Sequence, residues 1–143
     1  MSTHAMIPVL GHDNQLLPAY QAFADALRTS TFGGDIDSSY ASRLTMATDN
    51  SVYQKLPQLV VFPRSSADVQ AIFRLASQPQ HHQVRVTPRG GGTGTNGQAL
   101  NDGVVVDLSR YMNRVLWVDG ERRRARVEAG LIKDQLNEHL VAH

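Results

Sequence analysis

The chain has 143 residues, of which 41% are hydrophobic and 19% charged, and its formal net charge at neutral pH is +1. This size and balance are typical of one globular domain. The sequence holds no cysteine, which excludes disulfides and thiolate metal sites, and no apolar run approaches the roughly 18 residues of a membrane span. Because the N-terminus also lacks a charged region followed by an apolar core, we expect no secretory signal and a cytoplasmic location.

An amphipathic helix is predicted near the N-terminus, after a first dozen residues without periodicity. Apolar residues recur at helical spacing from Leu16 to Leu27, Pro18 suits a first turn, and Gly33-Gly34 end the segment. We therefore assign residues 1–34 to an N-terminal extension that contains this helix.

A parallel βαβ unit is predicted next. A short buried strand runs from Leu59 to Phe62, Ser65 caps a helix that ends near Pro79, and Val84 to Thr87 form a second strand. The crossover should be right-handed, and Val104 to Asp107 should extend the same sheet.

The pattern changes character after Met112. The runs Val115 to Val118 and Arg124 to Val127 flank Asp119-Gly120, a pair with a strong hairpin preference, so an antiparallel sheet should begin here. One face of a final helix carries Ile132, Leu136 and Leu140. The expected class is α+β, with a small parallel subdomain over residues 35–112 and the start of an antiparallel subdomain over residues 113–143.

A glycine-rich loop follows the second parallel strand, and five of the eleven glycines of the chain fall within its eight residues. Glycine permits positive φ and leaves room for a ligand, so consecutive N–H groups can converge on an anion. Hydroxyl and amide groups in the loop can donate further hydrogen bonds. The sequence therefore predicts a phosphate cradle formed by Gly90, Gly91, Gly92, Thr93, Gly94, Thr95, Asn96 and Gly97.

Two common phosphate loops do not fit this stretch. Residues 92–97 spell G-x-G-x-x-G after a strand, but only residues 98–102 precede the next strand region, which are too few for the helix of a Rossmann fold. A Walker A loop needs Lys and Ser or Thr after its last glycine, where Gln98-Ala99 stand. Arg89, directly before the loop, has two open interpretations: it neutralises a phosphate, or it pairs with a neighbouring carboxylate and holds the loop.

Several ordered motifs resemble the FAD-binding domain of the vanillyl-alcohol-oxidase (PCMH-type) superfamily. In chain order they are Arg43 to Tyr53, Val60 to Ser65, Pro88 to Gly97, Val104 to Arg110, Met112 to Arg114 and Val127 to Gly130. Within that superfamily they are most similar to bacterial FAD-linked D-2-hydroxy-acid dehydrogenases, the D-lactate, glycolate and D-2-hydroxyglutarate group. The resemblance covers roughly residues 35 to 140.

The resemblance implies FAD bound through Arg89, the glycine loop and Gly130, in an enzyme that oxidises a D-2-hydroxy acid and passes the electrons to an acceptor. Relatives that bind flavin covalently through this loop carry a histidine where Thr93 stands, so FAD should be non-covalent. The resemblance also implies a larger FAD domain and a substrate domain, so the chain is expected to be a truncated piece that is inactive alone and lacks an identifiable catalytic base. The alternative is a nucleotide- or phosphate-binding module without redox chemistry.

Other polar residues have plainer interpretations. Arg122-Arg123-Arg124 and Arg126 alternate faces among carboxylates, which predicts a solvated hairpin rather than a nucleic-acid surface. His81-His82 are expected at the surface rather than in catalysis or a metal site. The stretch Asp49-Asn50-Ser51 resembles a family segment close to flavin or substrate, and an Asx turn explains it equally well.

Overall fold

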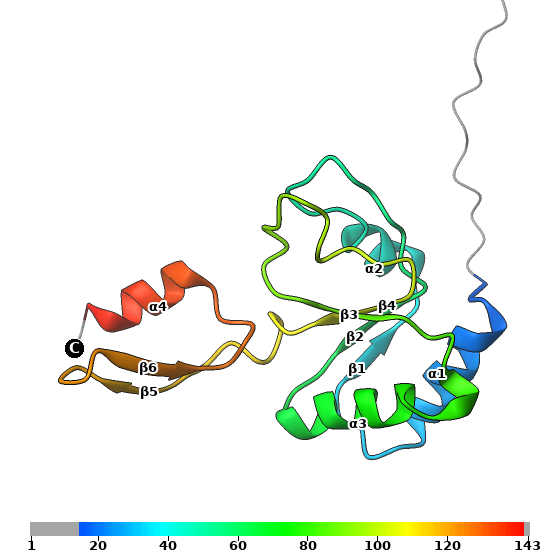
Figure 1. Cartoon of the computed structure of the whole chain (residues 1–143), viewed down its shortest axis with the longest axis horizontal. Coiled ribbons are helices and arrows are strands. Elements are labelled where there is room, and N and C mark those ends of the chain that lie inside the picture. The colour runs from blue at the N-terminus through cyan, green and yellow to red at the C-terminus, as the bar shows by residue number, and fades with distance from the viewer. Residues whose placement is uncertain (1–14, 142–143) are drawn as a thin grey trace, which may run out of the picture.

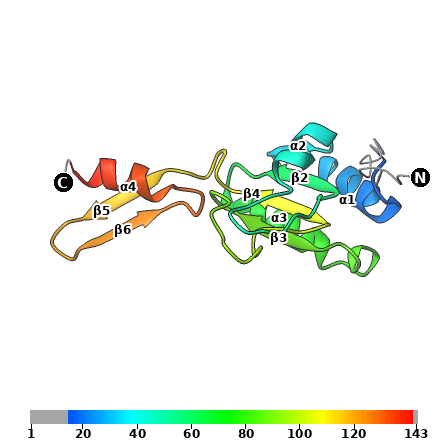
Figure 2. The same ribbon diagram turned by 90° about the horizontal axis from the view of Figure 1, so that it is seen from above.

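Two β-sheets organise residues 15–141, which are the residues that the computed structural model describes (Figure 1). The larger sheet has the strand order β1 (Asp35–Asp37), β2 (Leu59–Phe62), β4 (Val104–Asp107), β3 (Val86–Arg89), and the smaller sheet pairs β5 (Val115–Asp119) with β6 (Arg124–Val127). Figure 2 shows one lobe around each sheet. We call residues 15–107 the first lobe, 108–114 the connector and 115–141 the second lobe. The sheets confirm the predicted α+β class, whereas the first dozen residues lie outside the described range.

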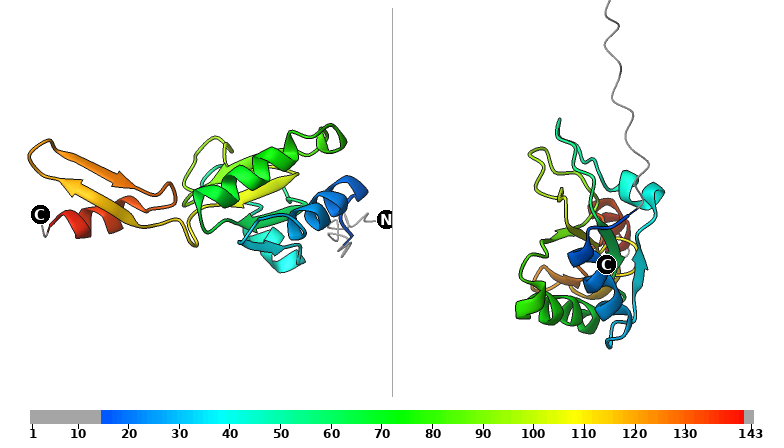
Figure 3. Two further views of the ribbon diagram at one scale, coloured as in Figure 1. Left: turned by 90° about the horizontal axis from the view of Figure 1, so that it is seen from below. Right: turned by 90° about the vertical axis from the view of Figure 1, so that its right-hand side faces the viewer.

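The core of the first lobe lies between the large sheet and two helices, α1 (Pro18–Arg28) and α3 (Ser66–Ala76), which cover the same face (Figure 3). Its buried members are Tyr20, Phe23, Ala24, Leu27, Leu59, Val61, Ile72, Val84, Val104 and Val106. The strand residues among them alternate along β2 and β4, as side chains on one face of a sheet must. Helix α1 begins at Pro18 as predicted, and its fully buried Phe23 and Leu27 make it part of the packing of the first lobe.

The opposite face of the sheet is covered by a helix that the sequence did not predict, α2 (Tyr40–Thr45), and by the loops around it (Figure 1). Val60 and Val105 are fully buried there. Arg43 of α2 is buried as well, and its Nε donates a 2.6 Å hydrogen bond to the carbonyl of Pro57. The helix therefore ties itself to the segment that leads into β2.

Strand β4 joins the parallel sheet as predicted, and it lies at the centre, between β2 and β3. All four residues of β4 are buried, and a strand with this composition gains most where neighbours cover it on both sides. Strand β3 contains Pro88, which has no N–H to donate and is tolerated at a sheet edge. Burial thus favours β4 at the centre of the sheet, and Pro88 favours β3 at its edge.

Strand β3 also begins two residues later than predicted, at Val86. Val84 instead closes a turn after the 3-10 helix η1 (Pro79–His81), donating its N–H to the carbonyl of His81 over 2.8 Å. The surface prediction is wrong for His81, which is 5% exposed and packs edge-on against Phe23 with ring centroids 5.4 Å apart. His82 is exposed.

The second lobe is an open hairpin followed by α4 (Lys133–Leu140). Asp119 pairs with Arg124 across the hairpin, and Arg123, not Gly120, takes the left-handed conformation in the turn. Every residue of β6 is exposed, and α4 has no buried residue. The final helix is confirmed, but its expected apolar face is largely uncovered, since Ile132 and Leu140 are exposed. None of the helices within residues 15–141 has the length and apolar character that crossing a bilayer demands.

Asp68 fastens the N-terminus of α3 to the preceding loops. Its carboxylate accepts backbone N–H groups from Gly33 at 2.7 Å and Arg64 at 2.8 Å, while Ser65 caps the helix as predicted. Burial opposes the charge, but these hydrogen bonds outweigh it and hold the pKa of Asp68 below its ordinary value. The stabilisation should be complete above the pKa of the unfolded chain and lost as pH falls through the lowered folded pKa.

We expect Asp68→Asn to lower the free energy of unfolding by about 2 kcal/mol, because an amide nitrogen cannot accept a backbone N–H. Thermal unfolding of the full-length gene product at neutral pH measures the effect. The exposed Glu121→Gln is the control and should unfold like the parent protein. The difference in the free energy of unfolding between the parent protein and Asp68→Asn should become smaller below about pH 4, where the Asp68 carboxylate gains a proton. An unchanged difference in acid would show that the charge of Asp68 does not cause the stabilisation.

Candidate functional site

The three parallel strands β2, β4 and β3 end at one edge of the large sheet, and the glycine loop leaves β3 at that edge. In open sheets with parallel strands, ligands bind outside the carboxyl ends of the strands. Figure 1 shows the glycine loop beside the loop that follows α2. The predicted cradle thus stands where the fold places ligand sites.

Two glycines of the loop are required by its own backbone. Gly92 and Gly97 have φ of +65° and +73°, which side chains resist. A Cβ on Gly92 would also collide with the guanidinium of Arg89, and one on Gly97 would lie 3.1 Å from the ring of Tyr53. Gly94 has no positive φ. A Cβ added there would lie 2.8 Å from the side chain of Gln98, which leaves little room for a larger residue.

Neither the backbone conformation nor neighbouring atoms require glycine at the first two positions of the loop, Gly90 and Gly91. A Cβ on Gly90 or Gly91 would meet its nearest neighbour only at 3.9 Å or 3.7 Å, an ordinary contact, and neither residue has a positive φ. The space beside both residues is therefore open, and no neighbouring side chain prevents close approach to their backbone. This is the geometry that a phosphate requires for close approach to the main chain.

Arg89 directly precedes these glycines, and its guanidinium lies against Gly92. Its Nη2 donates a 2.8 Å hydrogen bond to the carbonyl of Thr48, which ties the glycine loop to the loop after α2. Its Nη1 is buried and has no hydrogen-bond partner among residues 15–141. The holding role is therefore present, although the acceptor is a carbonyl rather than a carboxylate, and one buried donor remains for an anion.

Asp49 accompanies Arg89 in the same loop. Its Oδ1 accepts the N–H of Ser51 at 2.9 Å, which is the Asx turn that the sequence left as one interpretation. Hydrogen bonds from Ser51 and then the charge of Arg89 hold the pKa of Asp49 below its ordinary value against the opposing effect of burial. The carboxylate is thus a counter-charge for the guanidinium beside the loop.

Gly130 brings the second lobe against the site. A Cβ there would collide with the carbonyl of Leu108, and the Gly130 N–H donates to the carbonyl of Met112 over 2.8 Å. The carbonyl of the preceding residue, Ala129, is the nearest neighbour that a Cβ on Gly90 would have. Gly130 therefore has a packing role, and its direct contact with FAD stays a prediction.

The carboxyl edge also holds a charged cluster that the sequence analysis missed. Asp35, Arg64, Arg110 and Tyr111 meet there through hydrogen bonds and ring contacts. No sequence signal pointed to the cluster, because Asp35 and Tyr111 are 76 positions apart and each belongs to an ordinary polar stretch.

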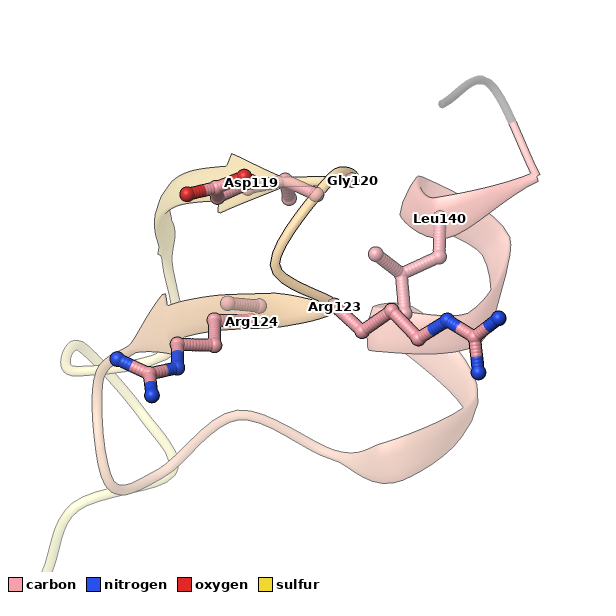
Figure 4. A pocket seen from close by; sticks show the side chains of 7 residues that line it. Asp119, Gly120, Arg123, Arg124 and Leu140 are labelled. Carbon is pink, nitrogen blue, oxygen red and sulfur yellow. The ribbon is translucent and has the colours of Figure 1, made fainter.

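The arginines of the hairpin lie away from both the glycine loop and the charged cluster. Arg122, Arg123, Arg124 and Arg126 are exposed around the tip of the hairpin. A hollow of about 360 Å³ lies between the hairpin and α4, lined by Val118, Asp119, Gly120, Arg123, Arg124, Ala125 and Leu140 (Figure 4). It contains no residue of the glycine loop. Across residues 15–141, no three His, Asp or Glu side chains lie close enough together to hold a metal ion.

These features define a class of protein: an α+β domain with a glycine-rich loop at the carboxyl edge of its parallel strands, where the sequence predicts a phosphate cradle. Residues 57–143 match the model of the FAD binding domain family, and the chain belongs to this family. The cofactor of the family is FAD, which agrees with the sequence prediction.

Known proteins extend this likeness over nearly the whole chain. The chain is 51% identical over 140 residues to the D-2-hydroxyglutarate dehydrogenase of Pantoea ananatis and 54% identical over 135 residues to that of Escherichia coli. These matches cover 98% and 94% of the chain but only 14% and 13% of the relatives. The chain therefore spans about a seventh of the length of these enzymes.

The fold is shared with a solved structure of another protein. Alkyldihydroxyacetonephosphate synthase superposes on 86% of this chain with a TM-score of 0.72 and 25% identity, using 25% of its own length. The likeness confirms the PCMH-type FAD-binding fold that the ordered motifs indicated.

Proposed function

We propose that this chain holds the pyrophosphate of non-covalent FAD in an enzyme that oxidises a D-2-hydroxy acid to the 2-oxo acid. The observation that carries the proposal is the open space beside Gly90 and Gly91, next to Arg89, whose buried Nη1 has no hydrogen-bond partner among residues 15–141. The relatives named D-2-hydroxyglutarate dehydrogenase support the substrate class.

Different groups of the loop contribute backbone donors, side-chain donors and a positive charge to the binding of the pyrophosphate. A pyrophosphate must exchange its water for other donors, and the N–H groups between Gly90 and Thr95 supply them without steric bulk. The side chains of Thr93, Thr95 and Asn96 are exposed and add donors, while Arg89 adds a positive charge. When bound, the isoalloxazine of FAD supplies the redox chemistry by accepting a hydride from the α-carbon of the substrate.

The remaining assignments of the sequence analysis belong to the same proposal. Residues 1–34 form an N-terminal extension whose helix α1 packs into the first lobe. Residues 35–112 form the first FAD-binding subdomain and residues 113–143 the start of the second. The enzyme passes its electrons to an acceptor and works in the cytoplasm. The alternative of a phosphate-binding module without redox chemistry loses support, since the close relatives are named as dehydrogenases.

The test uses the full-length gene product. We expect it to purify yellow and to release its flavin on acid or heat denaturation, because Thr93 cannot form the covalent bond that a histidine makes in this loop. Adding D-2-hydroxyglutarate, D-lactate or glycolate under anaerobic conditions should bleach the visible absorption band of the flavin with one member of the group, as hydride reaches the cofactor.

The L-isomers of the two chiral acids are matched controls and should leave the band unchanged. Flavin that stays with the precipitated protein would contradict the non-covalent assignment. A yellow protein that no D-2-hydroxy acid bleaches would overturn the substrate class, and a colourless protein that takes up no FAD would favour the phosphate-binding module.

A further inference from the structure

The charged cluster at the carboxyl edge joins three segments that are distant in the sequence. The carboxylate of Asp35, at the start of β1, accepts Arg64 Nη2 at 3.0 Å and the hydroxyl of Tyr111, and lies 3.8 Å from Arg110 Nη1. The guanidinium of Arg64 stacks 4.2 Å above the Tyr111 ring, and that of Arg110 stacks 4.1 Å above Phe62. The start of β1, the loop after β2 and the connector are therefore fastened at one point.

The charges favour a persistent arrangement at neutral pH. Hydrogen bonds from Tyr111 and then Arg64 hold the pKa of Asp35 below its ordinary value, and the bond to Asp35 raises the pKa of Tyr111. The carboxylate stays ionised and the phenol stays protonated over the neutral range. Tyr111 therefore remains a donor to a charged acceptor, which is the stronger kind of hydrogen bond.

Two of the fastened residues, Arg110 and Tyr111, belong to the connector, which is also where the second lobe returns to the first. Gly130 bonds to Met112, and Arg114 binds both carboxylate oxygens of Glu128, at 2.8 Å and 3.1 Å. The segment 128–130 then passes Gly90 of the glycine loop. Any shift of the connector must therefore move this segment relative to the cradle.

We propose that the Asp35 cluster positions the connector, keeping Ala129 and Gly130 beside the glycine loop and thereby setting the affinity for FAD. Tyr111 is in this role a positioning residue, acting through the connector rather than through contact with the cofactor. The inference rests on the proposed FAD function of the loop. It assigns a role to residues outside the predicted site.

Tyr111→Phe in the full-length gene product tests the proposal, because it removes the hydroxyl and keeps the ring under Arg64. We expect the Kd of the flavin-free protein for added FAD to rise about tenfold, as expected for the loss of one hydrogen bond to a charged group. Hydrogen exchange of residues 108–114 and 128–131 should become faster. Tyr20→Phe, in the buried core of α1, is the control: it should lower the melting temperature without changing the Kd for FAD.

Asp35→Asn and the double variant complete the test. If both residues act through one contact, the double variant should raise the Kd no more than the larger single change, whereas independent structural effects would multiply. An unchanged Kd in Tyr111→Phe, or a rise of the Kd in Tyr20→Phe as large as that in Tyr111→Phe, would overturn the proposal. Failure of the parent protein to bind FAD would instead overturn the proposed function.

Discussion

Gly130→Ala should detach the second lobe from the connector and abolish FAD loading. The added Cβ would collide with the backbone carbonyl of Leu108, which cannot rotate away as a side chain can. Overpacking of this kind costs about 3 kcal/mol, and the strain falls on the hydrogen bond between Gly130 and Met112. Thermal unfolding and the flavin-to-protein absorbance ratio of the full-length gene product measure the two effects.

The matched control is Gly120→Ala. Both changes add one methyl group to a glycine without positive φ, but a Cβ on Gly120 would meet no atom within 4 Å. This variant should load FAD and unfold like the parent protein. Normal flavin content in Gly130→Ala would show that the close approach to Leu108 is not needed to assemble the site.

Gly92→Val is expected to give a folded protein without FAD. The residue has a φ of +65°, which a β-branched side chain resists, and its Cβ would displace the guanidinium of Arg89. The substitution therefore disturbs both the curved backbone that faces the phosphates and the cation beside it. Far-UV circular dichroism should stay close to that of the parent protein, while the flavin absorbance of the purified protein disappears.

Gly120→Val adds the same side chain in open space and should retain FAD. Comparison with Gly94→Val separates the effect of backbone strain from that of a side-chain collision. Gly94 has no positive φ, and a side chain there would meet only the movable side chain of Gln98. We expect Gly94→Val to lose flavin less completely than Gly92→Val. Full flavin content in Gly92→Val would remove the cradle assignment.

Local pattern was sufficient for most of the elements. The helical spacing around Phe23, the cap at Ser65 and the alternation on either side of Asp119-Gly120 act over a few neighbouring residues, and the structure confirms the elements that they predict. The density of glycines after β3 likewise identified the loop. Such signals are readable because they arise from the backbone preferences of the residues themselves.

The local sequence pattern could not predict features that depend on residues far away in the chain. The surface prediction for His81 fails since Phe23, far away in the chain, provides a ring to pack against. The short β1 gave no periodic signal, because three residues form a strand only through pairing with β2. These features depend on which segments the fold brings side by side.

The sequence by itself determined the α+β class, since strand and helix patterns are local properties, and its ordered motifs determined the FAD-binding family through their resemblance to known proteins. Glycine density also predicted a phosphate loop after β3. The tertiary structure alone decided the central place of β4, the packing of Gly130 against Leu108 and the meeting of Asp35 with Tyr111. Each of these features depends on burial or contact between segments far apart in the chain. The residues that stabilise them cannot be identified from the neighbouring sequence.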